Sequence, residues 1–334
     1  MSFLKDIQKR VFELKSTATD TDFNLLALEI FNYQYKHNAI YKAYILSLKI
    51  EVPEINHYTK IPFLPIEFFK SQQVLCDSVN ANSVCFSSSG TTGQITSKHY
   101  VNDIALYEQS FNLGFELFYG NPKDYCILAL LPNYLERMGS SLVYMFDKLI
   151  QASKHPQSGF YLNNLEELKT TIELLKQRKQ KTILLGVTYA LLDLAEMGVE
   201  LTDDFIVMET GGMKGRRKEM LKEELHHTLK QGLHVNAIHS EYGMTELLSQ
   251  AYSKQNGVFE CPPWMKILIR DVNDPFSHVK SQKSGGVNVI DFANINSCSF
   301  IETKDLGKIT QDSYFEILGR FDNSDLRGCN LMIQ

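Results

Sequence analysis

The sequence predicts an α/β protein built on a parallel sheet, with a smaller β-rich part towards its C-terminal end. Between residues 125 and 239, short continuous apolar segments alternate with segments of helical periodicity, which is the pattern of a parallel sheet covered by helices. After residue 256 the apolar segments become shorter and are separated by Gly, Pro, Asn and Asp, as strands joined by turns are. We therefore expect a helical N-terminal part (1–80), an α/β core (81–255), a β-rich subdomain (256–322) and a tail (323–334).

The first fifty residues have the apolar spacing of helices, as in Phe3, Ile7 and Val11. Their tyrosines are interpreted as an aromatic stripe of the core rather than as ligand contacts: Tyr33, Tyr35, Tyr41 and Tyr44. The segment 61–70 that follows contains two prolines, which forbid a continuous helix and predict an extended, turned segment leading into a short helix.

The alternating region gives specific elements. Predicted strands lie at 125–131, 182–187, 205–208 and 235–239, and predicted helices at 140–150, 165–179, 190–197 and 216–229. In the last hundred residues, strand-like segments lie at 267–271, 287–293, 299–303 and 314–318. Ligands of parallel sheets bind at the carboxyl ends of the strands, so the loops that follow these strands are the candidate site.

Composition excludes several classes of protein. The chain has 34 basic and 39 acidic residues, a net charge of −5, and no basic run, so we expect no nucleic-acid partner. Six scattered cysteines without a Cys-x-x-Cys pair fit neither a disulfide scaffold nor a zinc ribbon. No apolar run reaches the ~20 residues of a membrane span, and the N-terminus is too polar for a signal peptide. A cytoplasmic protein without a membrane span is expected.

A loop rich in small hydroxyl residues follows the short apolar segment at 84–86. It consists of Ser87, Ser88, Ser89, Gly90, Thr91, Thr92 and Gly93. Glycines let backbone N–H groups approach a ligand closely, and these groups together with hydroxyls form a concave site for a polyphosphate. The alternative is a flexible linker; a Walker A loop is excluded because no Gly-Lys-Ser/Thr ends the segment.

Two further loops follow predicted strands of the core. Gly211 and Gly212 form a turn that can pass under a flat ligand such as a purine, although strand-to-helix turns also use glycine for fit alone. Further on, Tyr242-Gly243-Met244-Thr245-Glu246 combines an aromatic face, a glycine, a hydroxyl and a carboxylate. A purine can stack on the tyrosine, and the carboxylate can hold Mg²⁺ that bridges phosphates. The alternative is a helix start capped by Thr245 or Ser240.

The β-rich part has two polar positions of interest. Asp305 is expected at the end of a strand, where a carboxylate can accept both hydroxyls of a ribose; a β-turn is the alternative. Arg320 and Asp322 are expected after the last strand, where a guanidinium suits ribose or phosphate oxygens.

The order of these motifs resembles that of the adenylate-forming (acyl-CoA synthetase-like) superfamily, over 87–322. Within it the chain is most similar to the acyl-protein synthetase family, the LuxE-type subunits of fatty-acid reductases. The closer resemblance rests on Ile61-Pro-Phe-Leu-Pro-Ile-Glu-Phe-Phe-Lys70, Gly211-Gly-Met-Lys-Gly-Arg216 and Arg327-Gly-Cys-Asn-Leu331.

The resemblance implies ATP-dependent activation of a carboxylic, most typically fatty, acid as acyl-AMP. It places the β- and γ-phosphates on the Ser87–Gly93 loop, and adenine stacked on Tyr242 beside Gly211 and Gly212, with Gly243 also at the adenine and ribose site. Thr245 then contacts the α-phosphate, Glu246 holds Mg²⁺, and Asp305 binds the ribose with Arg320 nearby. Catalysis comes from positioning and charge stabilisation.

Superfamily members continue into a mobile C-terminal domain that carries a catalytic lysine, whereas this chain stops twelve residues after Asp322. We therefore expect that domain and the coenzyme A tunnel to be absent. Acyl-protein synthetases are similarly short and load a cysteine near their C-terminus, which here is Cys329, before a partner acceptor or reductase subunit takes the acyl group. Two alternatives stay open: transfer to coenzyme A or another small nucleophile, and a non-catalytic nucleotide- or acyl-binding protein.

Overall fold

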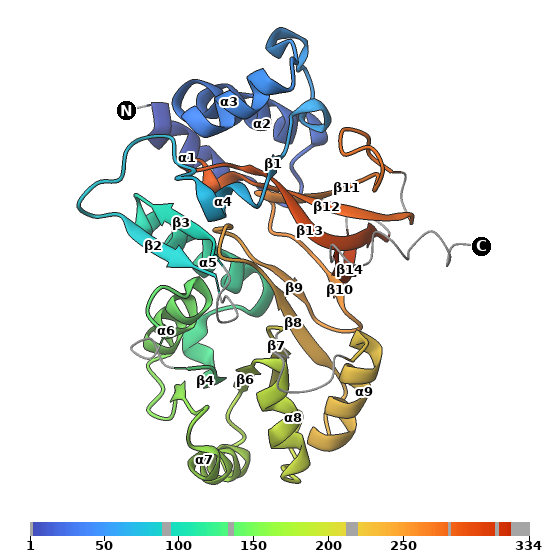
Figure 1. Ribbon diagram of the computed structural model, residues 1–334. Helices are drawn as coiled ribbons and strands as arrows, with labels where there is room; N and C mark the ends of the chain where they lie inside the picture. The colour runs from blue at the N-terminus through green and yellow to red at the C-terminus, as the bar shows by residue number, and fades with distance from the viewer. Residues whose placement is uncertain are drawn as a thin grey trace. The chain divides into compact units, whose positions relative to one another are not determined.

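The computed structural model describes residues 3–88, 95–132, 137–211, 220–279, 282–310 and 314–321, and the chain forms two units (Figure 1). The first unit consists of Met1–Ser83, Ser97–Asp103 and Cys261–Gln334, and the second of Val84–Thr96 and Ile104–Glu260. Among the described residues, no helix combines the length and the apolar character that crossing a bilayer requires.

The second unit contains the predicted parallel sheet. Its strands are β4 (Cys126–Leu130), β5 (Gly159–Phe160), β6 (Thr182–Gly186), β7 (Phe205–Glu209), β8 (Ile238–Tyr242) and β9 (Ala251–Ser253). They lie in the order β5-β4-β6-β7-β8-β9, parallel from β5 to β8, with β9 antiparallel to β8. Every residue of β4 and β6 is buried, which explains their continuous apolar sequence. The predicted α/β class with a parallel sheet is confirmed.

Helices connect these strands. They are α5 (Ile104–Tyr119), the 3₁₀ turn η3 (Pro122–Asp124), α6 (Ser141–Ser153), α7 (Leu165–Gln177), α8 (Thr188–Glu196) and α9 (Lys222–Leu233). Side-chain oxygens begin two of them: Ser140 accepts from the Val143 N–H at α6, and Asn164 accepts from the Glu167 N–H at α7. Two short strands, β2 (Val84–Ser87) and β10 (Val258–Phe259), complete the unit.

The boundaries around α9 differ from the prediction. The predicted helix at 216–229 starts instead at Lys222 and ends at Leu233; its first part, 216–219, lies outside the described residues. At its end His234 takes a left-handed conformation (φ 57°), and the Val235 N–H donates to the Lys230 carbonyl. This closure occupies residues that the sequence assigned to a strand, so β8 begins at Ile238 rather than at Val235.

The first unit combines N-terminal helices with C-terminal strands. The helices are α1 (Phe3–Glu13), α2 (Asp20–His37), α3 (Ala39–Ser47) and α4 (Phe68–Ser71), with 3₁₀ turns η1 (Val52–Glu54), η2 (Tyr58–Lys60) and η4 (Phe292–Asn294). The strands are β1 (Leu64–Pro65), β3 (Lys98–Val101), β11 (Met265–Arg270), β12 (Ser284–Asp291), β13 (Phe300–Ile309) and β14 (Phe315–Arg320). Strands β11 to β14 form an antiparallel meander, and β1 pairs in parallel with β13.

Helix α2 is held against the strands by a buried glutamine. Gln34 Nε2 donates to the carbonyls of Asn294 and Ile295 at 3.2 and 3.0 Å and to Ser299 Oγ at 3.0 Å. Its Oε1 accepts from the Ser299 N–H at 3.0 Å. Because the side chain is fully buried, it replaces the water that these backbone groups would otherwise require.

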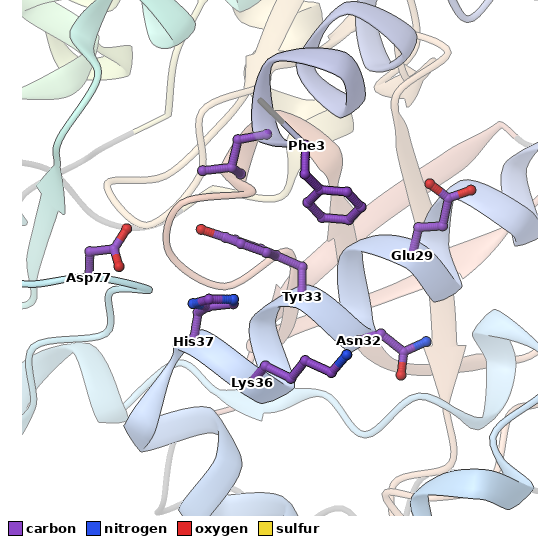
Figure 2. Close-up of a pocket in the computed structure, with 8 residues that line it drawn as sticks. Phe3, Glu29, Asn32, Tyr33, Lys36, His37 and Asp77 are labelled. Atoms are coloured by element: carbon purple, nitrogen blue, oxygen red, sulfur yellow. The ribbon is translucent and has the colours of Figure 1, made fainter. Parts of the chain in front are cut away.

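The aromatic stripe is only partly core. Tyr41 is fully buried, whereas Tyr35 and Tyr44 are half-buried. Tyr33 lines a cavity of about 780 Å³ in the first unit, where its ring stacks on His37 (centroids 4.5 Å apart) and lies 5.9 Å from Phe3 (Figure 2). None of the described site residues predicted from the sequence lines this cavity.

We expect Gln34→Ala to lower the free energy of unfolding of the first unit by about 2–3 kcal/mol, because it leaves the buried Ser299 N–H without its acceptor and takes one donor from each of the Asn294 and Ile295 carbonyls. Urea unfolding followed by Trp264 fluorescence measures this, since Trp264 is the single tryptophan and belongs to this unit. Gln73→Ala, at an exposed position of the same unit, is the control and should change the value by less than about 0.5 kcal/mol. An equally small effect at Gln34 would contradict the bridging role.

Candidate functional site

The register of the parallel sheet brings two predicted loops to the same edge. Glu209, the last residue of β7, is paired with Ser240 of β8. Gly211 follows the first by two residues and Tyr242 follows the second by two, so both lie at the carboxyl end of the sheet. Ligands of parallel sheets bind at this edge.

The Gly211 turn is fixed by backbone and side-chain hydrogen bonds. Gly211 has a φ of +73°, which favours glycine. Its N–H donates to Glu209 Oε2 at 2.8 Å, and its carbonyl accepts from the Thr188 N–H at 3.3 Å. The turn is therefore held from β7 on one side and from the start of α8 on the other. Its second glycine, Gly212, lies outside the described residues.

The last residue of β8 and the loop that follows it carry four of the predicted residues. Tyr242, Gly243, Thr245 and Glu246 lie in or next to a turn closed by the Leu247 N–H donating to the Met244 carbonyl at 3.1 Å. The chain then returns as β9, with Ala251 paired to Tyr242. No helix starts here, so the alternative of a capped helix start is wrong.

Burial differs among these loop residues. Glu246 is buried and Thr245 half-buried. Tyr242, the last residue of β8, is buried, and its ring contacts the Phe259 ring edge-on, with centroids 5.9 Å apart. A Cβ on Gly243 would lie 2.4 Å from Glu241 Oε1 and 3.3 Å from Gln250 Cγ, so the backbone here passes close to neighbouring side chains. A side chain at this position would require the Glu241 carboxylate to move.

A buried group of polar residues lies beneath the two loops, and the sequence analysis missed it. We call it the Glu209 cluster, and it consists of Glu209, Lys222, His226, Ser240 and Glu241. Lys222 Nζ lies 3.1 Å and His226 Nε2 3.7 Å from Glu209 Oε1, and the Ser240 hydroxyl lies 3.5 Å from His226 Nε2. The available signal was that both glutamates fall at or next to the carboxyl ends of predicted strands, where ligands bind.

The two buried glutamates have opposite pKa shifts. Burial by itself raises the pKa of Glu209, but hydrogen bonding from His226, the charge of Lys222, the Ser240 hydroxyl and the Gly211 N–H together hold it at about 2. Burial, reinforced by the negative charge of Glu209, raises the pKa of Glu241 to about 8. At neutral pH one is ionised and its neighbour is protonated.

The predicted phosphate loop starts from a firmly anchored strand. Phe86 of β2 is fully buried and contacts the rings of Tyr107 and Tyr144 edge-on, at 5.4 and 5.6 Å. The Ser87 N–H donates to the Gly139 carbonyl at 2.7 Å. Ser87 and Ser88 are half-buried, and the rest of the loop, Ser89 to Gly93, lies outside the described residues.

Asp305 and Arg320 belong to the first unit, and their predicted positions are corrected. Asp305 lies inside β13, neither at its end nor in a β-turn, because the strand continues to Ile309. Gly307, two residues further along the strand, lets β13 and β14 approach closely: a Cβ there would lie 2.7 Å from the Glu316 carbonyl oxygen. Arg320 is the last residue of β14 rather than a residue after it; Asp322 is outside the described residues.

The two residues are cross-strand partners. Asp305 and Arg320 are paired in the β13–β14 register, and Arg320 Nε lies 3.2 Å from Asp305 Oδ1. The arginine side chain is 71% exposed, so this ion pair is screened by solvent and contributes little to stability.

The cysteines fall into two groups. Cys76, Cys126 and Cys298 are buried, and burial raises the pKa of Cys126 to about 11 and of Cys298 to about 12, with Cys76 raised further. Cys85 is exposed and Cys261 half-buried. Cys329 lies outside the described residues.

No three His, Cys, Asp or Glu side chains gather as a metal site in the described part of the chain. Glu246 is a single buried carboxylate on a loop at the sheet edge. This fits Mg²⁺, which proteins commonly hold through one or two carboxylates together with substrate phosphates rather than in an all-protein cage.

Comparison with known proteins identifies this architecture. The family model described as "Acyl-protein synthetase, LuxE" matches residues 6–334. A search of curated proteins with the sequence returned no match.

Solved structures share the fold. A 2-hydroxyisobutyryl-CoA ligase in an open conformation, in complex with 2-HIB-AMP and CoA, is similar with a TM-score of 0.67 and 12% identity over 91% of this chain and 70% of that chain. The same ligase in the postadenylation state gives a TM-score of 0.68 at 12% identity over 91% and 68%. ATP-bound MatB from Rhodopseudomonas palustris gives 0.50 at 18% identity over 74% and 48%. At these identities the likeness shows the fold, which this chain shares with a CoA ligase seen with 2-HIB-AMP and with MatB seen with ATP.

The pKa of Glu241 gives a prediction for stability. Between its ordinary value of 4.5 and about 8, the unfolded chain ionises Glu241 while the folded chain keeps the proton, so stability falls as the pH rises through this window. Glu241→Gln removes this loss. We therefore expect the variant to gain stability over wild type as the pH rises. The difference between its free energy of unfolding and that of wild type should be about 1–3 kcal/mol larger, in favour of the variant, at pH 8.5 than at pH 5.

Urea unfolding followed by circular dichroism at the two pH values measures the difference. Glu173→Gln, at an exposed glutamate paired with Lys176, is the matched control and should show no pH-dependent gain. Parallel pH profiles for wild type and Glu241→Gln would refute the assignment of a protonated Glu241.

Proposed function

This chain belongs to the LuxE family of acyl-protein synthetases, and from that premise we propose that it uses ATP to activate a carboxylic acid, preferentially a fatty acid, and passes the acyl group to a cysteine thiol. The observation that carries the proposal is the loop after β8, which brings Tyr242, Gly243, Thr245 and Glu246 to the sheet edge at which the Gly211 turn also lies. An aromatic ring, a close backbone, a hydroxyl and a carboxylate are the groups that a nucleoside triphosphate requires.

The first step is adenylation. An oxygen of the acid's carboxylate attacks the α-phosphorus of ATP, the bond between the α-phosphorus and the bridging oxygen breaks, and pyrophosphate leaves with the electron pair. Thr245 donates a hydrogen bond to the α-phosphate, and the backbone and hydroxyls that begin at Ser87 hold the β- and γ-phosphates. Glu246 would hold Mg²⁺, which when bound would offset negative charge on the phosphates.

Nucleoside binding is assigned to three features. Adenine stacks on Tyr242 beside Gly243 and packs against the Gly211 turn. In the first unit, the Asp305 carboxylate is assigned to the ribose hydroxyls, with its cross-strand partner Arg320 beside it.

The second step moves the acyl group to Cys329. Its thiolate attacks the acyl carbonyl, the mixed-anhydride C–O bond breaks, and AMP leaves, giving a thioester that a partner acceptor or reductase subunit then takes. Burial supports this choice indirectly, because the raised pKa values of Cys76, Cys126 and Cys298 make these thiols poor nucleophiles at neutral pH.

ATP–pyrophosphate exchange across carboxylic acids of graded chain length tests the adenylation step. We expect acid-dependent exchange with a maximum at one chain length, and a reduction of about a hundredfold in Glu246→Gln because its Mg²⁺ ligand is lost. The exposed Glu173→Gln is the control and should retain wild-type exchange. ATP binding without exchange for any acid, with or without a reductase subunit, would favour the binding-only alternative.

Labelling with radioactive acid and ATP tests the acyl acceptor. We expect Cys329→Ser to abolish labelling of the protein while exchange stays at the wild-type rate, because adenylation precedes thiol attack. Cys85→Ser and Cys261→Ser are matched controls, since these are the more accessible of the described thiols, and both should label like wild type. Labelling that persists in Cys329→Ser but is lost in one of the controls would show that the control cysteine is the acceptor. Thioester formed only on added coenzyme A would show that coenzyme A, and not a cysteine of the protein, accepts the acyl group.

A further inference from the structure

The ammonium group of Lys222 contacts a neighbour of each of the two features assigned to the base. It is 3.1 Å from Glu209 Oε1, and the other oxygen of that carboxylate accepts the Gly211 N–H at 2.8 Å. It also lies 4.5 Å from the centroid of the Phe259 ring, which contacts the Tyr242 ring edge-on. A continuous series of contacts therefore runs from the Gly211 turn through Lys222 to Tyr242.

Helix stability does not explain a lysine at this position. Lys222 is the first residue of α9, whose N-cap makes no side-chain hydrogen bond and whose first turn otherwise contains Glu223 and Glu224. A cation at a helix N-terminus is unfavourable because it faces the positive end of the helix dipole. The contacts of the Lys222 ammonium group with Glu209 and with the Phe259 ring explain a lysine at this position.

Packing restricts where the ammonium group can lie. The lysine stem passes over Gly257, where a Cβ would lie 3.0 Å from Lys222 Cδ. The Glu209 side chain is 4% exposed and that of Lys222 is 32% exposed. Because water has little access to the carboxylate, the attraction between the two charges is stronger than that of an ion pair on an open surface. A cation over an aromatic face gains in the same way when it is desolvated.

We propose that Lys222 is a positioning residue that holds the Gly211 turn and the Tyr242 ring at the separation that an adenine base requires. The inference rests on the proposed function, because it takes these two features as the walls of the base site. Lys222 contacts neither the acid nor the phosphates in this scheme, so its loss affects nucleotide affinity selectively. A lysine that only neutralises Glu209 would affect stability instead.

Three variants separate these roles. Lys222→Met removes the charge and keeps the stem over Gly257, Lys222→Arg keeps the charge, and Phe259→Leu removes the ring while leaving the Lys222–Glu209 pair. The matched control is Lys176→Met, which removes a lysine paired with Glu173 at 2.8 Å on α7 of the same unit. The readouts are the ATP dissociation constant by calorimetry, KM for ATP and for the acid, kcat, and the melting temperature.

We expect Lys222→Met to raise both the ATP dissociation constant and KM for ATP by about tenfold or more, with KM for the acid and kcat within about twofold of wild type. Lys222→Arg should recover ATP affinity to within about threefold, and Phe259→Leu should weaken it by about threefold or more. Lys176→Met should bind ATP like wild type.

Unchanged ATP affinity in Lys222→Met would overturn the inference, and so would equal losses in KM for ATP, KM for the acid and kcat accompanied by a lower melting temperature. If Lys222→Met does not fold, Phe259→Leu decides the question, because wild-type ATP affinity in that variant excludes the contact series. Absence of acid-dependent exchange in a wild type that binds ATP refutes the adenylation proposal alone, since the dissociation constants still test Lys222. Absence of ATP binding by the wild type overturns both.

Discussion

The parallel register of four buried strands is the constraint from which the candidate site follows. Leu130 of β4, Gly186 of β6 and Glu209 of β7 are successive partners across the sheet, and Ser240 of β8 continues the row. A Cβ on Gly186 would lie 2.7 Å from Leu130 Cβ, so this close approach requires glycine. Strands β4, β6 and β7 end at this row and β8 ends two residues beyond it. The segments that leave these strands therefore emerge at one edge, where Gly211 and Tyr242 lie.

The end of this row also explains why charge is buried there. A carboxylate at the last position of a buried strand loses its water, and burial without partners would neutralise it. Glu209 remains ionised because it receives the Gly211 N–H and lies beside Lys222 and His226. The Gly211 N–H that stabilises the ionised Glu209 also fixes the Gly211 turn. The same hydrogen bond therefore determines both the charge of the carboxylate and the geometry of the loop.

The sequence predicted those features that are local. Buried parallel strands appear as continuous apolar runs, and the loops of the candidate site appear as unusual groups of glycine, hydroxyl and aromatic residues. Asp305 was misplaced because Gly307 permits a close strand approach as readily as a turn, and only the partner strand decides between them. The Glu209 cluster was missed because its members lie on β7, α9 and β8, and the alternation of apolar residues does not report which polar side chains meet.

The Glu209 cluster lowers the negative charge at the sheet edge to which the proposed reaction assigns the nucleotide. A nucleoside triphosphate is strongly anionic, and the edge assigned to it carries Glu209, Glu241 and Glu246, which would repel it if all three were ionised together. Lys222 offsets Glu209, and the raised pKa of Glu241 keeps a proton on that carboxyl at neutral pH. In the proposed reaction, the negative charge left for a divalent cation to offset would then be that of Glu246 and the phosphates.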